Sequence, residues 1–213
     1  MRLVDFYKEC HKLMFGIPYK NQPASFPVER KKIQTELKIP DGIPILLFNG
    51  ALDHRANQQA VEIILYHLNS EIKKRIQDYR IIICGRRLPD YLKNLPEDLW
   101  KNIIYTGFVD DIDLYIKGAD LHINPIISGG GVKTKVIEAL GYSKPVISFS
   151  TGAIGVKTEL CENKLFTCDD NDYSSFADLI QKAIAMEPIP CSQKFYEYYY
   201  LENIITQLDP YFI

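Results

Sequence analysis

The sequence predicts an α/β protein with a doubly wound, Rossmann-like parallel sheet. From residue 43 onward, short runs rich in β-branched residues alternate with helical patterns. These runs are apolar along most of their length, which is typical of strands buried on both faces of a parallel sheet. Four glycines, Gly50, Gly85, Gly107 and Gly129, each follow such a run. Because ligands bind beyond the carboxyl ends of parallel strands, these glycines predict the ligand-binding rim.

Six strands and the intervening helices can be placed in order. The strands are expected at residues 45–48, 80–84, 102–105, 121–124, 146–149 and 164–167. A long helix is expected over 57–76, because its apolar residues recur at helical spacing. Further helices are expected near 90–94, around 114–116, directly after residue 131 and over 173–185. Asp110 or Asp111 can cap the helix around 114–116.

The two ends of the chain do not follow this alternation. Residues 1–14 have a helical pattern, prolines then indicate a linker, and a second helix is expected over 29–38. We therefore divide the chain into a helical lead and linker at 1–40, a remnant of another domain or a hinge, and a ligand-binding domain at 41–213. Four tyrosines between residues 196 and 200 predict a carboxy-terminal helix that packs its rings on the domain.

Composition excludes several classes of protein. The chain has 213 residues, a formal net charge of −2 and a pI of about 6.1, so no nucleic-acid-binding surface is expected. Five scattered cysteines without a CxxC pair indicate reduced thiols rather than disulfides or a zinc site. No signal-peptide core and no apolar run of membrane-spanning length can be recognised. These features predict a soluble cytoplasmic protein whose contact with a membrane is at most peripheral.

The most informative segment follows the fourth expected strand. Its three consecutive glycines are Gly129, Gly130 and Gly131. Glycines there let a ligand approach bare backbone, and the unpaired N–H groups that open the next helix attract anions. Lys133 and Lys135 add positive charge at the same end. Glu138 follows about one helical turn later, where a carboxylate can accept hydrogen bonds from ligand hydroxyls. The pattern suits a diphosphate that carries a sugar.

Other interpretations of these motifs have less support. The loop is not a P-loop, because Val132 stands where that motif requires a glycine before the lysine. A plain connecting turn with a solvated first helical turn remains open. An NAD-binding fingerprint fails because the turn after Gly50 lacks the spaced glycines. Asp111 and Asp113 spell an Asp-x-Asp metal motif, but acidic residues at a helix start are explained by capping, and no metal is expected.

Several segments, taken in order, resemble the carboxy-terminal, donor-binding half of retaining GT-B glycosyltransferases of the group 1, family four type. The resemblance spans about residues 40–187. The segments that carry it are 46–52 with Asn57, 83–86, 105–111, 129–140 and 144–147.

The resemblance implies retaining transfer of a sugar from a UDP- or GDP-sugar, without a cofactor, in cell-surface polysaccharide or glycoconjugate synthesis. It places the diphosphate and sugar on the glycine loop and Lys135, and the ribose hydroxyls on Glu138. It loosely matches Arg55, after Gly50, to a basic phosphate-binding residue. The main chain at Phe108 and Val109 would meet the base. It identifies no catalytic residue.

Two features depart from the family. The family often carries two glutamates with seven residues between them; here the second is Glu138, and the first is replaced by Gly130. The acceptor-binding domain that precedes the donor domain in such enzymes is not matched, since only about 40 residues come before it. We therefore expect half of an enzyme, inactive without an acceptor-binding domain or subunit as its partner. The alternative is a non-catalytic nucleotide-sugar-binding subunit or regulator.

Overall fold

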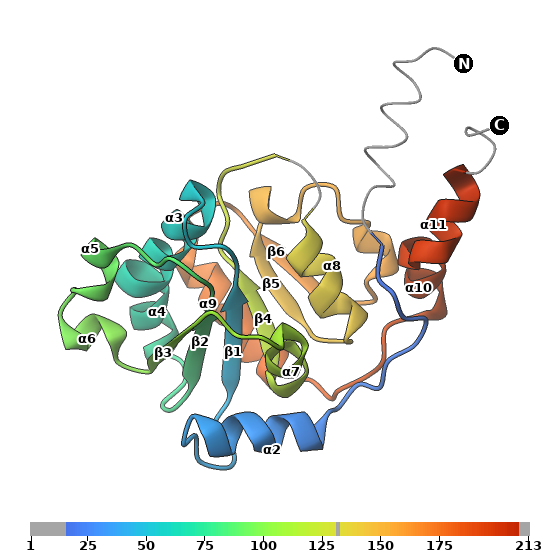
Figure 1. The fold of residues 1–213 in the computed structure, drawn as a ribbon. Helices are drawn as coiled ribbons and strands as arrows, with labels where there is room; N and C mark the ends of the chain where they lie inside the picture. Colours follow the sequence, from blue (N-terminus) through green and yellow to red (C-terminus); the bar gives the residue numbers. More distant parts are fainter. Residues whose placement is uncertain (1–15, 131–132, 209–213) are drawn as a thin grey trace.

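The computed structural model describes residues 16–130 and 133–208 (Figure 1). Its centre is a six-stranded sheet in the order β3-β2-β1-β4-β5-β6, in which every neighbouring pair is parallel. The order runs outward from β1 in one direction and from β4 in the other, which confirms the predicted doubly wound α/β fold. The expected helix at 1–14 lies outside the described residues.

All six predicted strands are present. They are β1 (Ile45–Asn49), β2 (Arg80–Cys84), β3 (Ile103–Gly107), β4 (Leu121–Asn124), β5 (Val146–Phe149) and β6 (Leu165–Cys168). Successive residues of β1 point to opposite faces of the sheet. Leu46 and Phe48 pack in the hydrophobic core on one face, and Ile45 and Leu47 pack in the core on the other. Burial on both faces explains why these runs are apolar without alternation.

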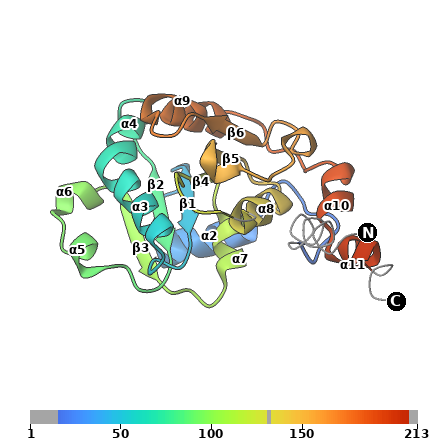
Figure 2. The ribbon, with the colours of Figure 1, turned by 90° about the horizontal axis from the view of Figure 1, so that it is seen from above.

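Helices cover both faces (Figure 2). One layer consists of α3 (Arg55–Ile63), the π-helical turn η1 (Ile64–Leu68), α4 (Asn69–Lys73) and α9 (Tyr173–Ile184). The other contains α2 (Pro27–Glu36), α7 (Ile112–Gly118), α8 (Thr134–Gly141) and α10 (Gln193–Tyr199). The shorter elements are α5 (Asp90–Lys93), α6 (Glu97–Trp100), η2 (Thr151–Ala153), η3 (Thr158–Leu160) and the last helix, α11 (Leu201–Leu208). In the described part of the chain, no helix is both long and apolar enough to cross a membrane.

Two predicted helices differ from those observed. The helix expected over 57–76 is interrupted by η1 and ends at Lys73, because side-chain periodicity does not reveal a local change of hydrogen-bond register. The helix expected from residue 29 begins at Pro27, which we had assigned to a linker. Proline is well suited to a first helical turn, since its fixed φ is helical and its missing N–H would be unpaired there.

The tyrosine-rich tail packs on the domain as predicted, but as two helices. Tyr196 is buried and its hydroxyl donates to the Gly141 carbonyl at 2.8 Å. The break between α10 and α11 falls at Tyr200, which forms a parallel β-bridge with Ile17. This pairing joins segments that are distant in sequence, so helical periodicity within the tail could not indicate it.

Gly50, Gly85, Gly107 and Gly129, the glycines that predicted the ligand-binding rim, lie at or shortly after the carboxyl ends of β1 to β4, as predicted. Gly85 is required by close packing: a Cβ atom there would lie 2.0 Å from the Gly50 carbonyl oxygen. Gly129 has a φ of +94°, a conformation that other residues rarely adopt. On the upper rim in Figure 1, Gly85 is therefore required by packing and Gly129 by its backbone conformation.

Candidate functional site

Two hollows lie on the carboxyl rim, one on each side of the connection between β1 and α3. The first has a volume of about 270 Å³ and lies between the start of α3, the end of β4 and the start of α8. The second has a volume of about 370 Å³ and lies between the ends of β1 and β2 and the loop that precedes α7. A ligand that occupies both would run across the rim of the sheet.

The first hollow contains most of the predicted phosphate-binding residues. Gly129, Gly130, Lys133 and Lys135 line it, while Gly131 lies outside the described residues. Helix α8 begins at Thr134 without a hydrogen bond from a capping side chain. Its opening N–H groups therefore face the same hollow as the two lysines. Together these groups form a positive site at the start of a helix, which favours an anion.

Lys135 is the central charge of this hollow. Its ammonium group donates to Asn57 Oδ1 at 2.8 Å and lies 4.6 Å from the centre of the Phe48 ring. Burial lowers the pKa of Lys135 to about 8, and the nearby charge of Glu138 opposes this shift. An amide oxygen and an aromatic ring do not neutralise an ammonium group, so Lys135 lacks an anionic hydrogen-bond partner among the described residues.

Lys133 has a different environment. Its ammonium group donates to the Gly129 carbonyl at 2.9 Å and thereby closes the glycine loop on itself. Burial lowers the pKa of Lys133, although less strongly than that of Lys135. Lys133 can therefore stabilise the loop and add charge to the hollow.

The second hollow contains the residues predicted to meet a base. Gly50, Phe108 and Val109 line it together with Arg86 and Asp110. The Phe108 side chain is 68% exposed although it is large and apolar, so its ring is free to pack on a flat ligand. This hollow is less polar than the first, as suits a nucleoside rather than a phosphate.

Glu138 lines neither hollow. Burial raises the pKa of its carboxyl group, Asp113 raises it further, and Lys135 lowers it. Asp113 belongs to α7, next to the second hollow, and Lys135 to the first. Within the described ranges, no side chain or backbone group donates a hydrogen bond to the Glu138 carboxylate, which therefore retains its full accepting capacity.

Arg55 is not brought into the site. Its guanidinium group pairs with Glu62 at 3.1 Å, and its side chain is 69% exposed. The neighbouring residues His54, Ala56 and Asn57 line the first hollow instead. Sequence reasoning could not distinguish these neighbours, because the turn that opens α3 decides which of them faces the rim.

Asn57 and Asn124 are site residues that sequence reasoning left without a role. Asn57 donates to the Ala51 carbonyl at 2.9 Å and accepts from Lys135, so it joins the β1 loop to α8. Asn124 lines the first hollow, and its amide group donates to Ser148 Oγ and the Gly152 carbonyl. A polar residue at the last position of an apolar strand was the available signal for Asn124.

His122 and the Asp-x-Asp segment have structural roles. His122 is buried and forms a 2.7 Å hydrogen bond with Asn49 Oδ1, as expected for a core histidine. Asp111 accepts from the Leu114 N–H and caps α7, which confirms the capping prediction, while Asp113 accepts from the Tyr142 hydroxyl. Among the described residues, no group of three or more His, Cys, Asp or Glu side chains could hold a metal ion.

A comparison with protein families matches residues 43–186 to the family described as "Glycosyl transferases group 1". The match includes both hollows and every strand of the sheet. No curated protein sequence matches the chain at a significant level.

Solved structures share the fold at low sequence identity. The Anabaena protein HepE in complex with UDP is 18% identical, with a TM-score of 0.67 over 88% of this chain and 53% of its own. A glycosyltransferase from Rickettsia africae is 17% identical, with a TM-score of 0.64 over 87% of this chain and 52% of its own. The chain thus spans about half the length of these proteins.

One solved structure has nearly the same extent as this chain. The C-terminal domain of the group 1 family protein LpcC from Francisella tularensis is 19% identical, with a TM-score of 0.54 over 94% of this chain and 97% of its own. The fold described here therefore corresponds to a carboxy-terminal domain.

Proposed function

Because the chain belongs to the group 1 glycosyl transferases, we propose that it binds the nucleotide diphosphate sugar that donates the sugar in a transfer reaction. The observation that carries this proposal is the first hollow, where a partly buried lysine without an anionic hydrogen-bond partner faces a glycine loop and a helix start. A diphosphate supplies the negative charge that this arrangement favours.

The two hollows suggest how the donor lies. The diphosphate and sugar occupy the hollow of Gly129, Gly130 and Lys135, and the base occupies the hollow of Phe108 and Val109. Glu138, whose carboxyl group is influenced by both Lys135 and Asp113, then accepts from the ribose hydroxyls. UDP in the HepE complex supports a uridine diphosphate as the nucleotide, and a guanosine diphosphate is the alternative. Arg55 contributes to the phosphates only if it leaves Glu62.

The reaction that we infer is transfer with retention of the anomeric configuration, in the synthesis of a cell-surface polysaccharide or glycoconjugate in the cytoplasm. The acceptor site would belong to a further domain or subunit, in keeping with the half-length match to the solved proteins. In this scheme the chain positions the donor and neutralises the leaving diphosphate with Lys135 and the α8 N–H groups.

Calorimetric titration with UDP, GDP and their common sugar derivatives tests the proposal. We expect saturable binding of one nucleotide series and competition between the nucleotide and its sugar derivative for one site. Amide NMR shifts should cluster at residues 129–138 and 107–110. The proposal is wrong if neither series binds, or if the shifts cluster away from the carboxyl rim.

Glu138→Ala is expected to weaken nucleotide binding while leaving inorganic pyrophosphate binding unchanged. A carboxylate that accepts two ribose hydroxyls loses charge-assisted hydrogen bonds, so affinity for UDP or GDP should fall by roughly tenfold or more. Glu138→Gln, which keeps the shape and one accepting oxygen, should fall between the wild type and alanine. Parallel loss of pyrophosphate and nucleotide binding would mean that Glu138 supports the loop rather than the nucleoside.

Nucleotide affinity should decrease as the pH rises through about 8, the pKa of Lys135. Below that pH the ammonium group is charged and attracts the diphosphate, whereas above it the neutral amine does not. The ligand phosphates are already ionised in this range, since their last pKa is about 6. Dissociation constants measured from about pH 7 to about pH 9.5 give the profile. Lys135→Arg, which stays charged, should flatten it; an unchanged profile in that variant would assign the titration to another group.

A further inference from the structure

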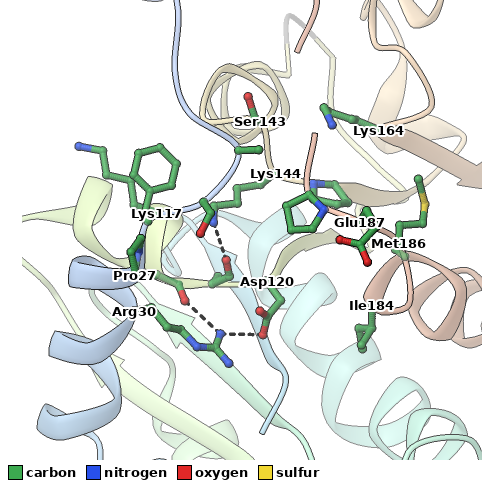
Figure 3. Close-up of a pocket in the computed structure, with 18 residues that line it drawn as sticks. Pro27, Arg30, Lys117, Asp120, Ser143, Lys144, Lys164, Ile184, Met186 and Glu187 are labelled. Atoms are coloured by element: carbon green, nitrogen blue, oxygen red, sulfur yellow. Dashed lines mark hydrogen bonds and ion pairs between the residues drawn. The ribbon is translucent and has the colours of Figure 1, made fainter. Parts of the chain in front are cut away.

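Cations at the two edges of the sheet are held by different kinds of partner. At the amino edge, Arg30 lines a cavity of about 310 Å³, and Figure 3 shows its guanidinium group paired with Asp120 at 2.6 Å. The same group donates to the Gly118 carbonyl at the end of α7. An anion and a helix-terminal carbonyl are ordinary structural partners of a cation. At the carboxyl edge, the Lys135 ammonium group instead donates to the neutral amide of Asn57.

The orientation of the Asn57 amide is set by its other neighbours. Asn57 lies in the first turn of α3, and its Nδ2 donates to the Ala51 carbonyl at 2.9 Å. A carbonyl oxygen only accepts, so the amide nitrogen faces Ala51 and Oδ1 faces Lys135. A Cβ atom at Gly50 would lie 2.8 Å from Asn57 Nδ2 and 2.9 Å from its Cγ, so the amide also packs against bare backbone. The acceptor offered to Lys135 therefore has a fixed direction.

The other groups around Lys135 leave its charge available to a ligand. The charged or titratable residues near it are Lys133, Glu138, His54 and His122. Burial lowers the pKa of Lys135, Glu138 opposes that shift and Lys133 adds to it. His122 is neutral, because burial lowers its pKa to about 3. Asn57 Oδ1 is the one hydrogen-bond acceptor of Lys135 in the part of the chain that the structure describes.

We propose that Asn57 is a positioning residue of the donor site. Its amide oxygen holds the Lys135 ammonium group in the first hollow without adding a negative charge that would compete with a diphosphate. This inference rests on the proposed function, in which Lys135 meets the diphosphate of the donor.

An amide suits this task better than an acidic or an apolar side chain. A carboxylate at residue 57 would form an ion pair with Lys135 and would place an oxygen against the Ala51 carbonyl. An apolar side chain would leave the ammonium group without an acceptor whenever no ligand is bound, which is costly for a partly buried charge. An amide donates to one neighbour and accepts from the other.

The simpler alternative is that Asn57 only secures the connection between β1 and α3 through Ala51. Gln59 offers a comparison on the same helix. Its Oε1 accepts from Ser128 Oγ at 3.0 Å, so it ties α3 to the start of the glycine loop without contacting Lys135. A variant of Gln59 therefore reports the effect of loosening α3 from the loop, and a variant of Asn57 reports any additional effect on Lys135.

The first measurement is the titration of Lys135 in the whole chain without ligand, by carbon NMR of its side chain from about pH 6 to about pH 11. The signal is the one that Lys135→Ala lacks. Asn57→Asp should raise the pKa of Lys135, because an anionic neighbour favours the ammonium form. Asn57→Leu should lower that pKa, because the charged form loses its acceptor. Gln59→Leu should leave it unchanged.

The second measurement is calorimetric titration of the same variants with UDP and GDP. At about pH 7, Asn57→Asp should weaken binding by about tenfold or more, because its carboxylate competes with the diphosphate for Lys135. Asn57→Leu should also weaken binding, because the ammonium group is no longer held in the hollow. The decrease of affinity with rising pH should move to higher pH in Asn57→Asp and to lower pH in Asn57→Leu. Gln59→Leu should keep the wild-type profile.

The outcomes separate this inference from the proposed function. An unchanged pKa of Lys135 in both Asn57 variants, with a lowered melting temperature like that of Gln59→Leu, would mean that Asn57 is only structural. Wild-type nucleotide affinity in both Asn57 variants would also overturn the inference and leave the proposed function intact. A wild type that binds no nucleotide would refute the proposed function and the donor role of Asn57, whereas opposite pKa shifts would still demonstrate that Asn57 controls Lys135.

Discussion

Sugar transfer by the isolated chain is expected to be absent or limited to slow donor hydrolysis, and an acceptor-binding domain is expected to restore it. Holding two reactants in the right geometry can supply roughly 7–11 kcal/mol of the reduction in the barrier. The proposed donor site lies on this chain, whereas the solved glycosyltransferase that it resembles is about twice as long. Transfer rates should be measured for the chain alone and with an acceptor-binding domain fused before Met1 or added in trans.

The interpretation of that assay depends on two controls. We expect residues 1–28 and the terminal helix to form the docking surface for the acceptor-binding domain. Ile205→Asp alters an exposed apolar position on α11 and should reduce the benefit of a domain added in trans. Lys135→Ala in the fused protein should slow transfer at low donor concentration, in proportion to its weaker donor binding. Rapid transfer by the isolated chain would contradict the half-enzyme hypothesis. Donor binding without transfer in every combination would favour the alternative of a non-catalytic nucleotide-sugar-binding subunit.

Lys135→Ala is expected to weaken UDP or GDP binding by about 1.5–3 kcal/mol, the range for a hydrogen bond that involves a charged group. That loss corresponds to roughly 10- to 150-fold in the dissociation constant. The physical reason is that the Lys135 ammonium group is partly buried beside the glycine loop, with an amide oxygen and an aromatic ring as its direct partners. Calorimetry at about pH 7, below the pKa of Lys135, measures the effect.

Lys101→Ala is the matched control, because Lys101 is an exposed lysine outside both hollows. It should bind nucleotide like the wild type. Burial lowers the pKa of Lys135, so its charge does not stabilise the folded state, and its removal should not reduce the melting temperature. Equal affinity of Lys135→Ala and the wild type would show that the phosphates bind elsewhere.

The strands and the carboxyl rim were predictable because they depend on local information. A strand buried on both faces must be apolar throughout, as at Ile81 to Ile83, and a parallel sheet places the loops after its strands on one edge. The glycines mark that edge for two reasons. A side chain would collide at Gly85, where a Cβ atom would lie 2.0 Å from the Gly50 carbonyl oxygen, whereas Gly107 and Gly129 have positive φ values of 75° and 94°.

The features that escaped prediction depend on contacts between distant parts of the chain. Asn57 gains its place in the site from Lys135, which is 78 positions away in sequence. Arg55 is a local exception: it faces Glu62, seven positions along the same helix, because of the way α3 begins. Tyr200 breaks the tail helix because the distant residue Ile17 lies beside it. No periodicity or short motif records such pairings.

The bridge between Ile17 and Tyr200 also has a mechanical consequence. The Ile17 N–H donates to the Tyr199 carbonyl at 2.8 Å, and the Leu201 N–H donates to the Ile17 carbonyl at 3.0 Å. A Cβ atom at Gly16 would lie 2.7 Å from the Leu201 Cα, so the two segments are in close contact. The two segments are therefore held together as one unit by paired backbone hydrogen bonds. A domain joined through either segment would be attached to this unit, residues 16–17 and 199–201, and a force on one segment would be transmitted to the other.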